Sequence, residues 1–466
     1  MKKEDDELYF GENILRYRED IIQDIKELVS IPSCAVLGND PEKPFGEEPA
    51  RALGWILQRA EELGLTAENV GNYAGHAEYG EGKEVAAVLT HVDVVPAGDG
   101  WASGPFAAVE QNGKLYGRGV ADDKGAAVVA LYCLKALKDG KIQGKRRLRA
   151  IFGAGEEVGM HDMERYFQTQ ELPVMAFTPD SDYGICNREK GILHLELSVP
   201  THDGTTLTAF RAGAALNSVP DKAYALLDCT EAEDHQLLRL ADAKEGSFAF
   251  HYTIDGMQIE SCGKASHAME PYKGKNAAAH LINLLCAGLG HRAMGSLCAF
   301  LNQYIGLETD GASLGIKQED AFSGPLTLNL GVVEIGANYA RAAVDIRYPV
   351  TADGEQIVKT IAGHANREGV GVRVLDQNKP LFVREDEPLI GLLKASYRAV
   401  TGEEPGLYAT GGGTYARRLG GHGVAFGPVF QGEECRLHNA NERIDIEHFM
   451  LHAQICLEAM YRMLTQ

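Results

Sequence analysis

The chain has 466 residues, of which 45% are hydrophobic and 24% charged, and its formal net charge is −21. This length is too great for one ordinary core, so we expect two domains. The acidic balance argues against a nucleic-acid partner and against an anionic membrane, since both bind through basic surfaces. The start, Met-Lys-Lys-Glu-Asp-Asp, leads into no apolar stretch, and no later run is long enough to span a bilayer. We therefore predict a cytoplasmic protein.

The nine cysteines are widely spaced, their number is odd, and they form no Cys-x-x-Cys pair. This pattern predicts neither a disulfide framework nor a thiolate zinc site. We expect most of these side chains to be small buried groups in a reducing compartment.

The first part of the chain alternates helical and strand-like segments. Apolar residues recur at helical spacing over 14–29, 49–63 and 124–138, and a last helix over 446–463 follows Asp445 as its cap. Unbroken apolar runs, typical of strands buried on both faces, occur at Val85–Leu89, Val174–Phe177 and Val424–Phe426. Leu148–Phe152, which is interrupted by Arg149, is also expected to form such a strand. This alternation predicts an α/β fold with a doubly wound, mainly parallel sheet.

The middle of the chain has a different pattern. Alternating hydrophobicity, as in Ile192–Val199, Leu326–Val333 and Ala342–Arg347, is interrupted by helical stretches near 272–290 and 354–368. We predict an inserted α+β lid domain over 187–384, and a first domain formed by 1–186 and 385–466.

Side chains that can bind metals follow the buried strands or directly precede the helix at 124. They are His91, Asp93, Asp122, Glu156, Glu157, Asp180 and His438. Because ligands of open α/β sheets bind beyond the carboxyl ends of the strands, we expect these side chains to gather at one sheet edge.

The residue types suit a centre of two metal ions. Zinc binds imidazole nitrogen and carboxylate oxygen, and an aspartate can bridge two ions by giving one oxygen to each. A further carboxylate must stay unligated to take a proton from water, so the adjacent Glu156 and Glu157 suit a base and a ligand. Gly153 and Gly155 would let the backbone turn sharply enough to aim both.

Each residue also has an ordinary explanation when it is taken alone. His91 could be a satisfied polar group at a strand end, and Asp122-Asp123 a helix cap with a charge that complements the dipole. Glu156-Glu157 could be an exposed acidic pair, and Asp180 part of a turn. Their convergence on one sheet edge favours the metal site.

At this point the residues resemble the zinc-dependent peptidases that include aminoacylases and glutamate carboxypeptidases. The segments that carry the resemblance are His91–Pro96, Gly117–Gly125, Gly155–Glu157 and Pro179-Asp180. Later segments resemble the branch of PepV-type dipeptidases and carnosinases, namely Gly263–Ala268, Asp345–Pro349 and Gly411–Tyr415. The resemblance extends from about residue 10 to the C-terminus.

The resemblance implies two zinc ions per chain, with manganese or cobalt as substitutes. His91, Asp122 and Asp180 would hold one ion, and Asp122, Glu157 and His438 the other. It also implies that Asp93 orients a ligand, that Glu156 is the general base, that His267 stabilises the oxyanion, and that the Asp122–Asp123 peptide bond is cis.

The same resemblance implies that Asn217 and Arg347 bind the terminal carboxylate of the substrate, assisted by Gly413 and Thr414. A guanidinium can grip a carboxylate with two parallel hydrogen bonds, although without the family context a surface ion pair would be the better explanation of Arg347. Ser218 stands where the family more often has an apolar residue.

These implications predict a monomeric metallopeptidase that cleaves dipeptides of the Xaa-Xaa or Xaa-His type. The long insert would take the place of a partner subunit. An alternative of the same chemistry is a deacylase of N-acyl amino acids, such as an aminoacylase or desuccinylase. An inactive metal-binding protein is a third reading, but such a protein has no need for an unligated Glu156 beside a ligating Glu157.

Overall fold

The structure, a computed structural model, describes residues 9–466. The chain divides into two compact units. Unit 1 extends to Asn187 and also contains Phe382–Tyr408 and Gly413–Gln466, whereas unit 2 comprises Arg188–Leu381 and Ala409–Gly412. The short segment Ala409–Gly412, predicted as part of the first domain, belongs to unit 2 in the structure. It packs with unit 2 because it accepts hydrogen bonds there, among them one from the Lys190 amide to the Thr410 carbonyl at 2.9 Å.

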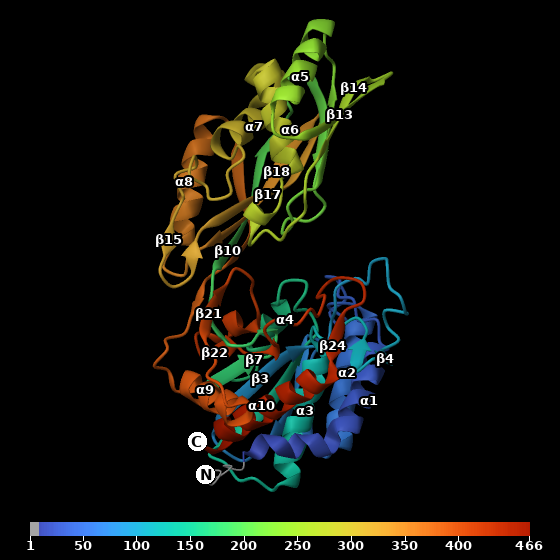
Figure 1. Ribbon diagram of the computed structural model, residues 1–466. Coiled ribbons are helices and arrows are strands. Elements are labelled where there is room, and N and C mark those ends of the chain that lie inside the picture. The colour runs from blue at the N-terminus through green and yellow to red at the C-terminus, as the bar shows by residue number, and fades with distance from the viewer. Residues whose placement is uncertain (1–8) are drawn as a thin grey trace, which may run out of the picture. The chain divides into compact units, whose positions relative to one another are not determined.

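Unit 1 is built on a mixed sheet (Figure 1). Its strands in spatial order are β1 (Thr66–Val70), β2 (Ala74–Tyr79), β6 (Arg146–Gly153), β3 (Glu84–His91), β7 (Met175–Thr178), β22 (Gly423–Ala425), β9 (Ile185–Glu189) and β20 (Leu381–Phe382), with β21 (Leu407–Thr410) also paired to β9. The four strands from β6 to β22 are mutually parallel, whereas β1, β2 and β9 pair antiparallel.

Helices cover both faces of this sheet, which confirms the doubly wound α/β class. The helices of unit 1 are α1 (Arg18–Val29), α2 (Glu47–Glu62), α3 (Lys124–Asp139), α4 (His161–Tyr166), α9 (Pro388–Thr401) and α10 (Ile446–Thr465), with 3-10 helices η1 (Phe10–Tyr17) and η3 (Tyr415–Leu419). Helix α3 is buried on nearly all sides because it lies against β3 and β6 and is itself covered by α1 and α10. As predicted, the Asp445 side chain caps α10.

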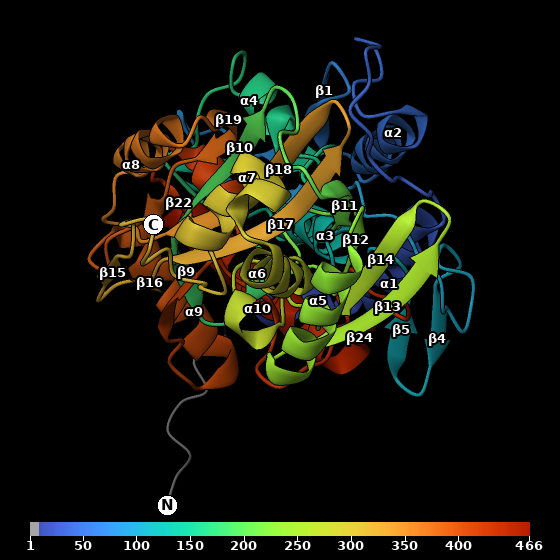
Figure 2. The same cartoon turned by 90° about the horizontal axis from the view of Figure 1, so that it is seen from above.

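Unit 2 contains an eight-stranded antiparallel sheet. Its spatial order is β13 (Ser247–Thr253), β14 (Gly256–Cys262), β12 (Lys222–Leu227), β11 (Leu207–Ala212), β17 (Thr327–Gly336), β18 (Tyr339–Tyr348), β10 (Gly191–Val199) and β19 (Gly371–Asn378). Its helices are α5 (Glu231–Ala243), α6 (Ala277–Leu289), α7 (His291–Tyr304) and α8 (Gly354–Arg367), of which α5–α7 overlie the strands in Figure 2. The alternation predicted for β10 is present, with Leu193, Leu195 and Leu197 in the core.

The helix predicted over 272–290 is shorter than expected. Pro271–Lys273 forms a separate 3-10 turn (η2), and α6 begins at Ala277 because the Asn276 side chain accepts the Ala279 amide at 3.1 Å. The helix predicted over 14–29 likewise divides into η1 and α1.

The remaining strands of the described residues are short and form three small separate sheets. In unit 1, β4 (Val109–Gln111), β5 (Lys114–Tyr116) and β24 (Arg443–Asp445) form a three-stranded ribbon, and β8 (Ser181–Asp182) pairs with β23 (Pro428–Val429). In unit 2, β15 (Glu319–Asp320) pairs with β16 (Gly324–Pro325). Across residues 9–466, no helix combines the length and the apolar composition needed to cross a bilayer.

Candidate metal centre

Three neighbouring parallel strands of unit 1 end at the cluster of acidic and imidazole side chains. His91 is the last residue of β3, Glu156 and Glu157 follow β6, and Asp180 follows β7. Since β6, β3 and β7 are adjacent and parallel, their carboxyl ends meet at one edge of the sheet.

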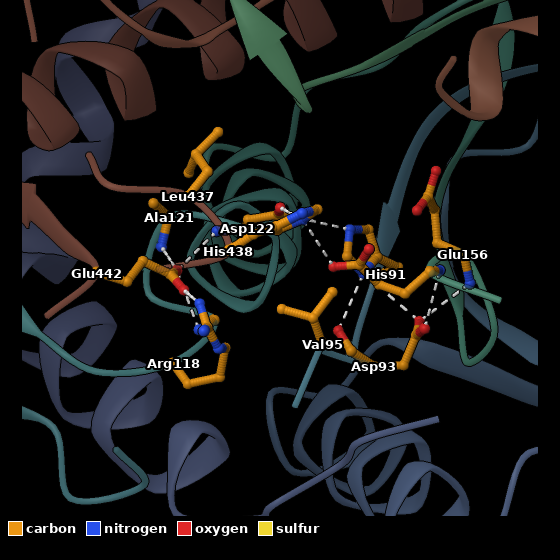
Figure 3. A network of polar contacts seen from close by, with 12 residues as sticks. His91, Asp93, Val95, Arg118, Ala121, Asp122, Glu156, Leu437, His438 and Glu442 are labelled. Atoms are coloured by element: carbon orange, nitrogen blue, oxygen red, sulfur yellow. Dashed lines mark hydrogen bonds and ion pairs between the residues drawn. The ribbon is translucent and has the colours of Figure 1, made fainter. Parts of the chain in front are cut away.

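The ribbon of β5 and β24 brings the remaining two side chains to the same edge. Because Arg443 pairs with Tyr116, the residues before β24 lie against those after β5. Asp122 thereby stands between two imidazoles (Figure 3): its Oδ1 lies 3.0 Å from His91 Nε2, and its Oδ2 lies 3.0 Å from His438 Nε2. A bridging carboxylate offers its two oxygens in this way.

Other donor atoms converge on the same place. His438 Nε2 lies 3.3 Å from Glu157 Oε1. Ligand atoms of His91, Asp122 and Glu157 lie within 4.8 Å of one another, as do those of His91, Glu156 and Asp180. His91 Nε2 and Glu157 Oε1 are buried yet form no hydrogen bond of acceptable geometry, close as they are to these neighbours. Buried polar atoms of this kind fit a bound cation, which would satisfy them.

The electrostatics also fit a cation. Burial, followed by the charge of a neighbouring carboxylate, raises the pKa of Asp180, Glu156 and Glu157. Burial alone would raise the pKa of Asp122 too, but its contacts with the two imidazoles hold that pKa well below the usual range. Asp122 and Glu157 in turn raise the pKa of His438 to about 11. The cluster is therefore short of positive charge, which a divalent ion would supply.

Asp93 holds the turn that follows β6. Its buried carboxylate accepts the amide of Glu156 on Oδ1 and that of Glu157 on Oδ2, both at 3.1 Å. Its carbonyl lies 3.0 Å from His91 Nδ1 and can only accept, so Nδ1 carries the proton of a neutral ring. His91 Nε2 then keeps its lone pair, as a metal ligand requires.

The chain does turn directly after β6, with the Gly159 amide donating to the Glu156 carbonyl, but neither Gly153 nor Gly155 uses a positive φ to make this turn. Both glycines are needed for space. A Cβ at Gly155 would lie 2.5 Å from the Phe45 ring, and one at Gly153 would overlap the side chains of Tyr415 and Asp162. The Asp122–Asp123 peptide bond is cis, as the resemblance implied.

Glu442 and Arg118 were missed by the sequence analysis, although Arg118 lies inside a quoted motif and Glu442 only four residues after His438. Both are fully buried and paired, with Glu442 Oε2 accepting Arg118 Nη1 at 2.6 Å. Glu442 Oε1 accepts the amides of Gly119 and Ala121 at 3.0 Å each and that of Asp122 at 3.2 Å (Figure 3). The pair thus ties the loop of His438 to the loop of Asp122.

The predicted substrate-binding residues His267 and Asn217 lie together in unit 2. The Ala268 amide, next to His267, donates to the Asn217 carbonyl at 2.9 Å. The side chains of His267 and Asn217 are both exposed. His267 Nδ1 accepts the Met269 amide at 3.1 Å, so a neutral ring carries its proton on Nε2. This tautomer carries an N–H donor of the kind that an oxyanion accepts.

Arg347, also in unit 2, is 5% exposed and forms a buried ion pair rather than a surface one. Its Nε and Nη2 each donate to the Asp345 carboxylate at 2.6 Å, and Nη1 donates to the Gly411 carbonyl at 3.0 Å. Asp345 also contacts His194 Nε2 at 3.2 Å. The three hydrogen bonds of Arg347 to Asp345 and Gly411 fix the plane of its guanidinium group.

Gly413 and Thr414 belong to unit 1, at the start of η3. The Thr414 hydroxyl caps η3 by accepting the Ala416 amide at 3.2 Å. Gly413 packs against the Arg417 guanidinium, where a Cβ would come within 2.7 Å of Nε. Both residues thus have a local structural role in addition to the one predicted.

Solved structures share this fold at low sequence identity. Human carnosine dipeptidase 1 aligns with a TM-score of 0.59 and 16% identity, covering 97% of this chain and 98% of its own. The dipeptidase Dug1p of Saccharomyces cerevisiae gives a TM-score of 0.59 and 14% identity, with the same coverage of both chains.

Sequence relatives match over nearly the whole length. A Bacillus subtilis protein named "Putative dipeptidase YtjP" is 36% identical over 463 residues, which is 97% of this chain and 98% of its own. A Staphylococcus aureus relative that also carries the dipeptidase name is 33% identical, over 98% and 99% of the two chains. The model of peptidase family M20/M25/M40 matches residues 87–462, an interval that includes every side chain of the cluster. The family resemblance is therefore confirmed, and the chain belongs to peptidase family M20/M25/M40.

Proposed function

We propose that this protein hydrolyses dipeptides of the Xaa-Xaa or Xaa-His type, acting as a monomer with a two-metal centre and Glu156 as the general base. The observation that carries the proposal is the position of Asp122 between His91 and His438, beside a Glu156-Glu157 pair on one turn. The names of the full-length relatives support the dipeptide class of substrate.

We assign His91, Asp122 and Asp180 to one ion and Asp122, Glu157 and His438 to the other, with zinc as the metal and manganese or cobalt as substitutes. When bound, such ions lower the pKa of water and polarise the scissile carbonyl. Asp123 contributes from outside these sets, because its Oδ2 accepts the His91 amide at 3.2 Å and so fixes the end of β3.

Glu156 takes a proton from the attacking water on its carboxylate and returns it to the leaving amine nitrogen. Asp93 keeps the backbone of Glu156 in register with that of the ligand Glu157. The Nε2 proton of His267 is donated to the oxyanion as charge develops there.

Arg347 and Asn217, with Gly413 and Thr414, bind the carboxylate of the leaving amino acid. Asp345 takes the Nε and Nη2 side of the guanidinium, so the substrate would meet the edge formed by Nη1 and Nη2. This requirement for a free C-terminus limits the substrates to short peptides.

Glu156→Gln and Glu157→Gln test the assignment of base and ligand. Glu156→Gln should retain both ions by elemental analysis and lose at least about 100-fold in turnover, because the general base is gone. Glu157→Gln should lose metal from one site. Normal turnover by a fully loaded Glu156→Gln enzyme would show that the mechanism is wrong.

The substrates in this assay separate the two candidate activities. Unblocked dipeptides, including β-alanyl-histidine, are compared with N-acetyl and N-succinyl amino acids after loading with zinc, manganese or cobalt. Turnover confined to the acylated compounds would identify the protein as a deacylase of the same chemistry.

A further inference from the structure

Buried carboxylates hold all three backbone amides of the turn that carries Glu156. Two of these amides, those of Glu156 and Glu157, donate to Asp93 as described above. The third, that of Gly155, donates to Asp162 Oδ2 at 2.9 Å. Asp162 is thus a second clamp on the same turn, and it lies outside the metal-binding set.

Asp162 lies near the start of α4 and is itself fully buried. Its Oδ1 accepts the Met163 amide at 2.7 Å, whereas its Oδ2 accepts the Tyr415 hydroxyl as well as the Gly155 amide. Each oxygen therefore faces only N–H or O–H donors, and the carboxylate can rotate in neither direction without losing a bond.

Tyr415, the residue whose hydroxyl binds Asp162, belongs to η3 and is far from Asp162 in the sequence. Its side chain is fully buried, and its ring meets the His91 ring edge to face, with centroids 6.3 Å apart and planes at 88°. One tyrosine thus contacts both a proposed metal ligand and, through Asp162, the turn of the proposed base.

The packing around Gly153 supports the same connection independently. Gly153 is the last residue of β6, and a Cβ there would overlap both the Tyr415 hydroxyl and the Asp162 carboxylate. The pair therefore packs directly on the backbone that leads into the turn. In such close packing the turn cannot shift unless the pair shifts with it.

We infer that Tyr415 and Asp162 are positioning residues for Glu156, fixing the Gly155–Glu157 turn so that the base stays aimed at the reacting water. The inference rests on the proposed role of Glu156. Misplacement of a reacting group by about 1 Å can cost about 100-fold in rate. Glu157 has further contacts with His438, so loosening the turn should disturb the base more than the ligand.

Tyr415→Phe is the decisive variant, because it removes the hydroxyl and keeps the ring against His91. We expect kcat to fall by about 10-fold or more, with KM within about twofold of wild type and with unchanged metal content. Asp162→Asn should lose more, because its amide group would face an N–H or O–H donor whichever way it turns.

Tyr132→Phe is the matched control. The Tyr132 hydroxyl donates to the Asp24 carboxylate at 2.7 Å, and both residues are buried in unit 1, on α3 and α1. The variant loses the same kind of buried phenol–carboxylate bond, together with a 3.2 Å hydrogen bond from Arg59 Nη2. Neither bond involves the 155–157 turn, so the kcat of this variant should match that of wild type.

Wild-type kcat in Tyr415→Phe would overturn the inference, and a loss of metal from that variant would do so as well, since it would assign the pair to the ions rather than to the base. An equal fall in Tyr132→Phe would overturn it by pointing to general loosening. None of these results touches the proposed function, which is tested separately by Glu156→Gln and by the comparison of dipeptides with acylated amino acids. Should Asp162→Asn not fold, Tyr415→Phe decides alone.

Discussion

At the scale of single residues, Arg347, which we propose to bind the substrate carboxylate, is already held by several hydrogen bonds within the chain. Within residues 9–466, three of its five N–H groups have partners: two on Asp345 and one on the Gly411 carbonyl. One N–H on Nη1 and one on Nη2 remain. The side chain is thus pre-oriented, and little rotamer entropy is lost when a carboxylate binds.

Arg347→Ala should erase the preference for dipeptides with a free C-terminus over amidated ones, a loss of about 2–5 kcal/mol for a buried charge partner. The ratio of kcat/KM for the two substrates within each variant is the measurement, because it cancels any general loss of stability. Arg341→Ala is the control, since Arg341 lies on the same strand β18 as Arg347 but is exposed, where it pairs with Glu334 of β17. Equal hydrolysis of free and amidated dipeptides by the wild type would remove Arg347 from the site.

The clustering of the proposed metal ligands could be predicted because each of them follows a recognisable strand or lies in a recognisable motif. The residues that hold them could not, because their roles depend on partners far away in the chain. Glu442 lies 324 residues from Arg118, and Tyr415 lies 253 residues from Asp162. A sequence shows that such side chains can donate or accept, but only the fold shows which group each one meets.

At the scale of elements, α10 contains a buried histidine whose surroundings disfavour the protonated, charged form of the ring. His452 is fully buried, its Nδ1 contacts the Tyr183 hydroxyl at 2.9 Å, and its Nε2 has no hydrogen-bond partner among the described residues. Burial lowers the pKa of His452 from 6.5 to about 3. Below pH 6.5 the unfolded chain therefore binds a proton that the native chain does not. The free energy of unfolding consequently decreases as the pH is lowered from 6.5 towards 3.

His452→Phe should consequently become more stable relative to wild type as the pH falls from 6.5 towards 4, by up to about 1.4 kcal/mol per pH unit. Near pH 7.5 the ring is neutral in both the folded and the unfolded chain, so any difference in stability there reflects only the lost contact with the Tyr183 hydroxyl and does not vary with pH. Thermal unfolding midpoints at one scan rate, from pH 7.5 to 4.5, are the measurement.

His448→Phe on the same helix is the control, since His448 is exposed and pairs with Glu433 at 2.6 Å. It should show no gain at low pH. Parallel curves for His452→Phe and wild type would contradict the account of the buried ring.

The elements that could be predicted are those with a strong apolar pattern, such as α3, α10 and the four parallel strands. Helix α5 has only Leu237 fully buried, so its apolar signal is weak, although the Thr230 and Glu233 capping box marks its start. Helix α7 is interrupted at Gly295, which breaks the helical spacing in the sequence.

At the scale of the whole molecule, the two units differ in what they can report. Both tryptophans, Trp55 and Trp101, lie in unit 1, as do all five proposed metal ligands. Tryptophan fluorescence therefore follows unit 1 alone, whereas far-ultraviolet circular dichroism follows the helices and strands of both units.

Metal addition should raise the unfolding midpoint seen by fluorescence, since an ion that binds only the native state adds about 4 kcal/mol at 1,000 times its Kd. The circular dichroism curve should separate into a shifted part and an unshifted part. His438→Ala, which removes a proposed ligand, should reduce the shift. A single transition that moves as one in both signals would contradict independent unfolding of the units.

The insertion itself could be predicted from the change in hydrophobic pattern, but the segment Ala409–Gly412 could not be assigned. Four residues show no periodicity, and their place in unit 2 depends on hydrogen bonds to Arg347 and Lys190. A stretch this short acquires its partners only through the fold.

The pairing of β7 with β22 has a consequence for how the protein is made. The two strands are neighbours in one sheet, yet roughly 250 residues separate them. A ribosome that adds about 5–20 residues per second needs roughly 12–50 seconds to cover that distance. Throughout that time the nascent chain carries a sheet with one side of β7 unpaired, an open edge that invites association with other chains. Unit 2 emerges almost entirely within the same interval and can fold first, whereas the proposed metal site, which includes His438, can be completed only near the end of synthesis.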